Sequence, residues 1–309
     1  MRMRPLSGPA VLALLLAVAL AFALYPAGRR RAGLVKRKLA GEIPIGWKQL
    51  AVGMVPGAPL RSGLREALGW GSPYWIRAMD FADDLAQGFK VHPIVDGRTP
   101  SMARFESHFS ILQAGQTPHP PHGHAEEEVI VLLSGQLVVI REDAATGHRT
   151  EEPAATGELV YHSSENIHTL RAVGPGPARY LVLKWGGVAV PGPDAVLAPK
   201  TIPYQQAMAA HEQRAEGFAS TLIFEGPTRY LRRLHCHVST VRPGAGYDPH
   251  HDDYDVAIVL LKGTVETVGQ RVEAPSVIFY SADEPHGLRN VGGNTAEYVV
   301  FEFHGPIQL

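Results

Sequence analysis

Four side chains able to bind a metal ion lie in two short segments of the sequence. His122, His124 and Glu128 occupy even-numbered positions of one segment, and His168 follows in a later one. In an extended strand, residues of the same parity share one face. Two imidazoles and a carboxylate on one face can converge on a divalent ion, with His168 completing the shell. Such a shell keeps positions open for water, dioxygen or a substrate.

A weaker form of this pattern recurs near the C-terminus. When the two segments are aligned through their final glycines, His250 takes the place of His122, Asp252 that of His124 and His286 that of His168. Val256 takes the place of Glu128. A shift of one residue would instead place on one face His251, Asp253 and Asp255. A His250/Asp252/His286 triad would suit ferrous iron. A degenerate barrel kept for packing explains the same residues, and we favour that interpretation.

These residues belong to two copies of one module. Four pairs of segments correspond at a nearly constant offset: 88–97 with 217–226, 107–115 with 236–244, 129–135 with 257–263, and 163–171 with 281–289. Each copy consists of short apolar segments separated by Gly and Pro turns, which is typical of β-barrels. Helical periodicity appears in 204–216, between the copies.

The repeat predicts an all-β protein with two tandem barrels. The expected parts are a signal or anchor over 1–28, an N-terminal extension over 29–87, a metal-binding barrel over 88–192, a linker helix over 193–216 and a degenerate barrel over 217–309.

An apolar segment opens the chain. Residues 5–28 carry no charge, and Arg29, Arg30 and Arg31 follow directly. A segment of this length can cross a bilayer as a helix, and flanking positive charge favours the cytoplasmic side. We expect a single-pass hydrophobic helix that anchors a cytoplasmic body to the membrane. The alternative is a signal peptide cleaved near Ala21–Ala23, with a secreted or periplasmic body.

The overall composition favours small-molecule chemistry. The 29 Lys+Arg and 30 Asp+Glu nearly cancel, so no net field would attract nucleic acid. The single cysteine, Cys236, excludes an internal disulfide. We expect a small-molecule substrate and no nucleic-acid partner, and a homo-oligomer remains open.

The histidine segments resemble the two motifs of the cupin superfamily, G-x5-H-x-H-x3,4-E-x6-G and G-x5-P-x-G-x2-H-x3-N. The first motif here has six residues between Gly115 and His122. In the second, the usual Pro, Gly and Asn are replaced by Ser163, Glu165 and Ala172. The resemblance covers both copies, the bicupin arrangement, and implies jelly-roll barrels with the ion inside. It favours Fe2+ or Mn2+ as the cofactor, with Ni2+, Cu2+ and Zn2+ as alternatives.

The resemblance implies an enzyme acting on a small organic substrate. A dioxygenase-type oxidoreductase is the leading hypothesis, with Glu165 as a candidate base. Because bicupins also include oxalate decarboxylases and an amidohydrolase, metal-dependent decarboxylation or hydrolysis is the alternative. A non-catalytic barrel that binds or senses a small ligand is the rival class.

Overall fold

The computed structural model describes residues 69–82, 88–190, 196–211 and 217–306, together with Leu39 and Arg65. The chain divides into two units, Met1–Trp70 with Leu309, and Gly71–Gln308. All strands of the described residues lie in the second unit. The expected anchor or signal over 1–28 lies outside the described residues and stays a prediction. Within the described ranges, no helix combines the length and apolarity that a membrane crossing requires.

The first barrel is made of two antiparallel sheets. Its six-stranded sheet has the order β10-β7-β4-β9-β3-β2. The bounds are β10 (Lys200–Pro203), β7 (Glu158–His162), β4 (Glu127–Ser134), β9 (Ala178–Gly186), β3 (Arg104–Leu112) and β2 (Phe89–Gly97). Facing it is a three-stranded sheet of β6 (Arg149–Ala155), β5 (Gln136–Glu142) and β8 (Ile167–Val173).

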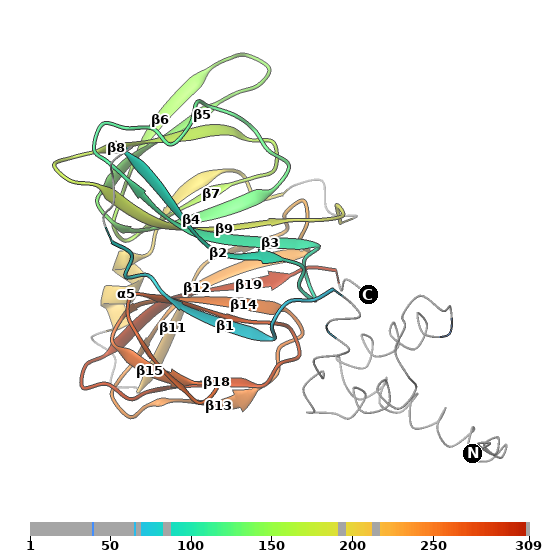
Figure 1. Ribbon diagram of the computed structural model, residues 1–309, viewed down its shortest axis with the longest axis vertical. Coiled ribbons are helices and arrows are strands. Elements are labelled where there is room, and N and C mark those ends of the chain that lie inside the picture. The colour runs from blue at the N-terminus through green and yellow to red at the C-terminus, as the bar shows by residue number, and fades with distance from the viewer. Residues whose placement is uncertain are drawn as a thin grey trace. The chain divides into compact units, whose positions relative to one another are not determined.

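The second barrel repeats this plan. Its six-stranded sheet contains β1 (Tyr74–Ala78), β17 (Ser276–Tyr280), β14 (Asp255–Lys262), β19 (Ala296–His304), β12 (Arg233–Val241) and β11 (Phe218–Gly226), in that order. The smaller sheet contains β13 (Gly246–His250), β18 (His286–Asn290), β15 (Thr264–Thr267) and β16 (Gln270–Glu273). The barrels are stacked through their large sheets (Figure 1). The prediction of a β fold is confirmed.

Each large sheet is buried on both faces, and alternation decides which residue faces which core. On β4, Ile130 and Leu132 join the core inside the first barrel, whereas Val129 and Val131 join a core shared with the second barrel. Even-numbered positions of β4 therefore point into the barrel. This parity places Glu128 inside the first barrel and Glu127 between the barrels.

The two barrels exchange strands. β1 precedes the first barrel in sequence but pairs with β17 of the second, with Tyr74 opposite Tyr280. β10 precedes the second barrel but pairs with β7 of the first, with Lys200 opposite Tyr161. Neither strand was predicted, because each is short and gains its partner only across a long sequence separation. The linker region 193–216 thus contains a strand as well as its helix, α5 (Gln205–His211).

Two buried carboxylates connect the barrels. Glu127 of the first barrel accepts hydrogen bonds from the Thr228 hydroxyl and the Arg229 amide. Asp255, at the matching position of the second, accepts them from the Thr99 hydroxyl and the Ser101 amide. Each barrel thus binds a loop of the other.

Candidate metal sites

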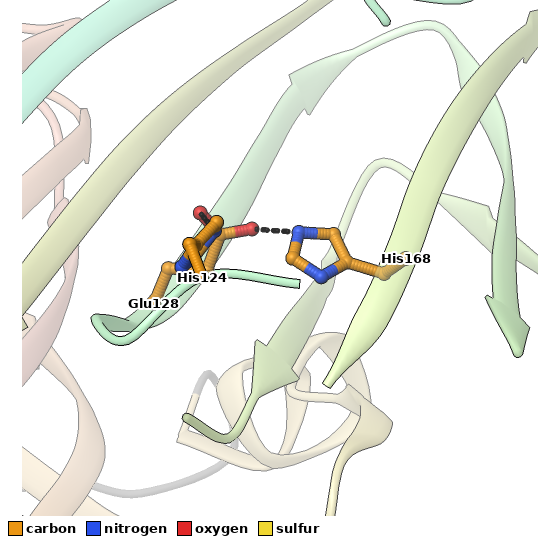
Figure 2. A group of neighbouring side chains, drawn as sticks. All are labelled: His124, Glu128 and His168. Atoms are coloured by element: carbon orange, nitrogen blue, oxygen red, sulfur yellow. Dashed lines mark ion pairs between the residues drawn. The ribbon is translucent and has the colours of Figure 1, made fainter. Parts of the chain in front are cut away.

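The first candidate site brings together His124, Glu128 and His168 (Figure 2). Glu128 lies at the start of β4, and His168 lies on β8 of the opposite sheet. The Nε2 atoms of His124 and His168 lie 3.5 and 2.9 Å from the two oxygens of the Glu128 carboxylate. Ligands around one first-row metal ion lie at about this spacing, because metal–nitrogen and metal–oxygen bonds are about 2.0–2.2 Å.

Backbone carbonyls orient both imidazoles. The Nδ1 of His168 lies 2.8 Å from the Asn166 carbonyl oxygen, and that of His124 lies 2.9 Å from the Glu126 carbonyl oxygen. A carbonyl can only accept, so each Nδ1 carries a proton. Each Nε2 faces Glu128: it donates to that carboxylate when the ring is protonated, and would present its lone pair to a metal ion when the ring is neutral. Metal-binding histidines are commonly held in this way.

The carboxylate of this site stays ionised although it is buried. Burial alone would raise the pKa of Glu128, but hydrogen bonds from His124 and His168 hold it well below its ordinary value. The Glu128 carboxylate in turn raises the pKa of His124. The group therefore offers an anion and two nitrogen donors, a set that suits a divalent transition metal.

His122 lies beside this group and is not one of its members. Its ring centre is 5.6 Å from that of His124 and 6.1 Å from that of His168. Two backbone hydrogen bonds of 3.2 Å tie its main chain to that of His168. The Nδ1 of this exposed ring lies 3.3 Å from the Pro120 carbonyl oxygen, and His122 is absent from the group of potential ligand atoms that lie within 4.8 Å of one another. The structure thus assembles three of the four predicted ligands.

Two residues near the site escaped the sequence analysis. The His162 ring stacks on His168 at a centroid distance of 3.8 Å, and burial lowers the pKa of His162 to about 3, so this ring is neutral. Lys184 places its Nζ 4.0 Å from an oxygen of Glu128. Both lie on strands at inward-facing positions, and that parity was the available signal.

Glu165 lies in the turn that precedes β8. Its amide donates to the His124 carbonyl at 2.8 Å, and its side chain is exposed. Its φ of 63° lies in the left-handed region, as does the φ of 69° at Asp283, the matching residue of the second barrel. A positive φ explains why glycine is usual here in the motif.

The second barrel contains a comparable group. The Nε2 atoms of His250 and His286 lie 3.5 and 3.3 Å from the same oxygen of Asp252. The carbonyl of Glu284 holds the Nδ1 of His286, just as Asn166 does for His168. Burial would raise the pKa of Asp252, but hydrogen bonds from the two histidines lower it.

The structure does not show the alternative alignment of the second barrel, in which His251, Asp253 and Asp255 would share one face. Asp255 is buried between the barrels, whereas His251 and Asp253 are exposed. His250, Asp252 and His286 instead line a cavity of about 250 Å³, together with aromatic and apolar side chains that include Tyr247, Tyr254 and Tyr298. The barrel expected to be degenerate therefore combines three potential ligands with a cavity.

Comparisons with known proteins agree with this fold. Residues 108–184, which span most of the first barrel, match the family model described as a cupin domain. No curated protein matches the chain in sequence. Among solved structures, the oxalate decarboxylase of Bacillus subtilis at pH 4.6 is similar with a TM-score of 0.55 and 16% identity, covering 77% of this chain and 78% of that one.

A second similar structure is the formate complex of the Lactobacillus farciminis oxalate decarboxylase. Its TM-score is 0.54 at 11% identity, over 77% of this chain and 87% of that one. At these identities the likeness shows a common fold.

Proposed function

We propose that this protein is a divalent-metal enzyme that decarboxylates a small organic acid at the His124/Glu128/His168 site. The observation that carries the proposal is the donor set itself, two oriented imidazoles and an ionised carboxylate with Lys184 alongside. The similar oxalate decarboxylase structures support decarboxylation over the dioxygenase chemistry that the motifs favoured.

The three side chains fit a first-row divalent ion. Their nitrogen and oxygen donors suit Mn2+ or Fe2+, whereas Ca2+ and Mg2+ prefer oxygen alone. The ion would bind substrate oxygen and stabilise developing negative charge. We name Mn2+ or Fe2+ as the resident ion.

Two further residues are proposed to act on the substrate, Lys184 by binding it and Glu165 by transferring a proton. The ammonium group of Lys184 lies inside the barrel, 4.0 Å from Glu128, where it can pair with a substrate carboxylate. In decarboxylation a carbon–carbon bond breaks, CO2 leaves, and the electron pair that remains on carbon takes up a proton. Glu165 lies beside the main chain of His124 and is the proposed acid–base group.

One observation supports a second candidate function in the second barrel. His250, Asp252 and His286 form a two-histidine, one-carboxylate set, which is typical of non-haem iron oxygenases. The cavity beside them is lined by tyrosines and apolar residues that would suit an aromatic substrate. A dioxygenase activity would reside here.

The deciding experiment measures CO2 release and oxygen uptake by the Mn2+- and Fe2+-loaded protein against small mono- and dicarboxylic acids and phenols. Release of CO2 without oxygen consumption, lost in His124→Ala, supports decarboxylation in the first barrel. Oxygen uptake lost in His250→Ala but kept in His124→Ala supports the second candidate. Stoichiometric binding of an acid without turnover would instead identify a non-catalytic binding protein.

A further inference from the structure

A third group of potential ligands lies on the inner face of the large sheet of the second barrel. His235 and His237 occupy alternate positions of β12, and Glu302 lies opposite His235 on β19. The Nε2 of His235 and the Nδ1 of His237 are 3.2 Å apart, and the Nδ1 of His237 is 3.9 Å from Oε1 of Glu302. The side chains are 15–20% exposed, at the wall of the barrel.

The spacing of the two imidazoles matches that of adjacent ligands on one ion. Two nitrogens each about 2.1 Å from a metal lie roughly 3.0 Å apart in octahedral and 3.4 Å apart in tetrahedral geometry. The observed 3.2 Å falls between these values. The Glu302 oxygen is slightly farther away and requires a small side-chain shift to coordinate.

Each end of the cluster has an outer partner that fixes its orientation. Glu225 accepts a hydrogen bond at 2.9 Å from the Nδ1 of His235, so the Nε2 of the neutral His235 ring carries the lone pair and accepts from the Nδ1 of His237 at 3.2 Å. A metal ion would take the place of the proton shared by these two nitrogens. The Nε2 of His304 lies 2.8 Å from Oε2 of Glu302, so Oε1 remains directed at the histidines. A carboxylate behind a histidine is the common outer shell of protein metal sites.

The first barrel supplies an internal comparison. At the matching positions of β3 and β9 it has Glu106, His108 and Lys184, with Glu106 directly opposite Lys184. A lysine there places positive charge where the second barrel has the Glu302 carboxylate. The second barrel thus has an anion in place of this cation, which favours a bound cation, and a histidine in place of the glutamate, which supplies a nitrogen ligand of the kind that transition metals bind.

We propose that His235, His237 and Glu302 form a binding site for Zn2+ or a similar divalent transition metal, distinct from the His250/Asp252/His286 group. Two histidines and one glutamate leave a coordination position open, as in catalytic zinc sites. His237 and Glu302 also line the cavity that contains His250, Asp252 and His286. A ligand in that cavity can therefore reach the open position. The guanidinium of Arg233, 3.8 Å from Oε2 of Glu302, weakens binding of a cation.

The test uses Zn2+ alone and the full chain with His124→Ala and His250→Ala, which disable the other two groups. Equilibrium dialysis with metal analysis should find one Zn2+ per chain. Glu302→Lys introduces the lysine that the first barrel has at the matching position, Lys184, and should weaken Zn2+ binding at least about tenfold. His108→Ala, the first-barrel match of His237, should leave binding unchanged.

The proposal is overturned if the background protein binds no Zn2+, or if Glu302→Lys binds it undiminished. The thermal unfolding midpoint of each metal-free variant checks that it folds. Should Glu302→Lys fail to fold, His237→Asn replaces it, with the same expected loss. Co2+ titration adds a second readout, because the visible absorption of the ion reports loss of histidine ligands.

Discussion

Removing the Glu127 carboxylate should destabilise the protein far more than removing the carboxylate of the adjacent Glu126. Four donors converge on it: the Tyr161 hydroxyl, the Trp185 indole, the Thr228 hydroxyl and the Arg229 amide, at 2.5–3.1 Å. Glu127 is completely buried, so water cannot replace the lost acceptor in a tightly packed core. Glu127→Ala therefore leaves four buried hydrogen-bond donors without an acceptor.

The magnitude follows from these contacts. A hydrogen bond to a charged group contributes roughly 1.5–3 kcal/mol, and removing one partner of a buried charged network costs about 3–5 kcal/mol. We expect Glu127→Ala to lower the free energy of unfolding by about 4 kcal/mol. Because Thr228 and Arg229 belong to the second barrel, the loss should also weaken coupling between the barrels.

Urea unfolding followed by tryptophan fluorescence measures this effect. The control is Glu126→Ala, which removes the half-exposed ion pair with Arg104 and should cost less than about 1 kcal/mol. Glu127→Gln, which retains one side-chain acceptor oxygen, should fall between the two. Equal destabilisation by Glu126→Ala and Glu127→Ala would refute the reasoning.

Three further changes test the site and the fold. His124→Ala should weaken Mn2+ binding at least about tenfold, whereas exposed His148→Ala should not; equal affinities on titration calorimetry would rule out His124 as a ligand. Burial lowers the pKa of His162 to about 3, whereas the unfolded chain takes up this proton at about pH 6.5. The neutral His162 ring therefore contributes its full stability to the fold above about pH 6.5, and this contribution is lost as the pH falls toward 3. From pH 7 to pH 5, the free energy of unfolding of the metal-free protein, measured with urea, should fall by about 2 kcal/mol more than that of His162→Phe. Equal decreases in the two proteins would contradict this. Gly135→Ala would place a Cβ 2.6 Å from the Pro177 carbonyl oxygen at a φ of 87°, whereas Gly147→Ala meets no atom within 4 Å at a φ of 67°. In calorimetry Gly135→Ala should thus lower the melting temperature clearly more than Gly147→Ala, whose cost is backbone strain of about 1–2 kcal/mol; equal shifts would show that the steric contact is relieved.

Local regularities of the sequence were enough to predict the fold class and the proximity of three side chains in the first candidate site. Strand parity places Glu128 inside the barrel, and the motif spacing places His168 on a strand of the opposite sheet. The repeat likewise predicted that His250, Asp252 and His286 correspond to ligands of the first barrel. These inferences depend on period and spacing, which a chain displays before it folds.

Only the tertiary structure decided how the two copies fit together and which side chains share a site. β1 and β10 each precede one barrel and complete a sheet of the other, and no local pattern marks that exchange. Lys184 reaches Glu128 from a strand more than forty residues later in the sequence, and His162 stacks on His168 although the two lie in different sheets. His122 has the motif spacing, yet its ring lies outside the group formed by His124, Glu128 and His168. Spacing along the chain determines the face on which a side chain lies, whereas its ring orientation and its neighbours depend on packing between strands that meet only in the folded protein.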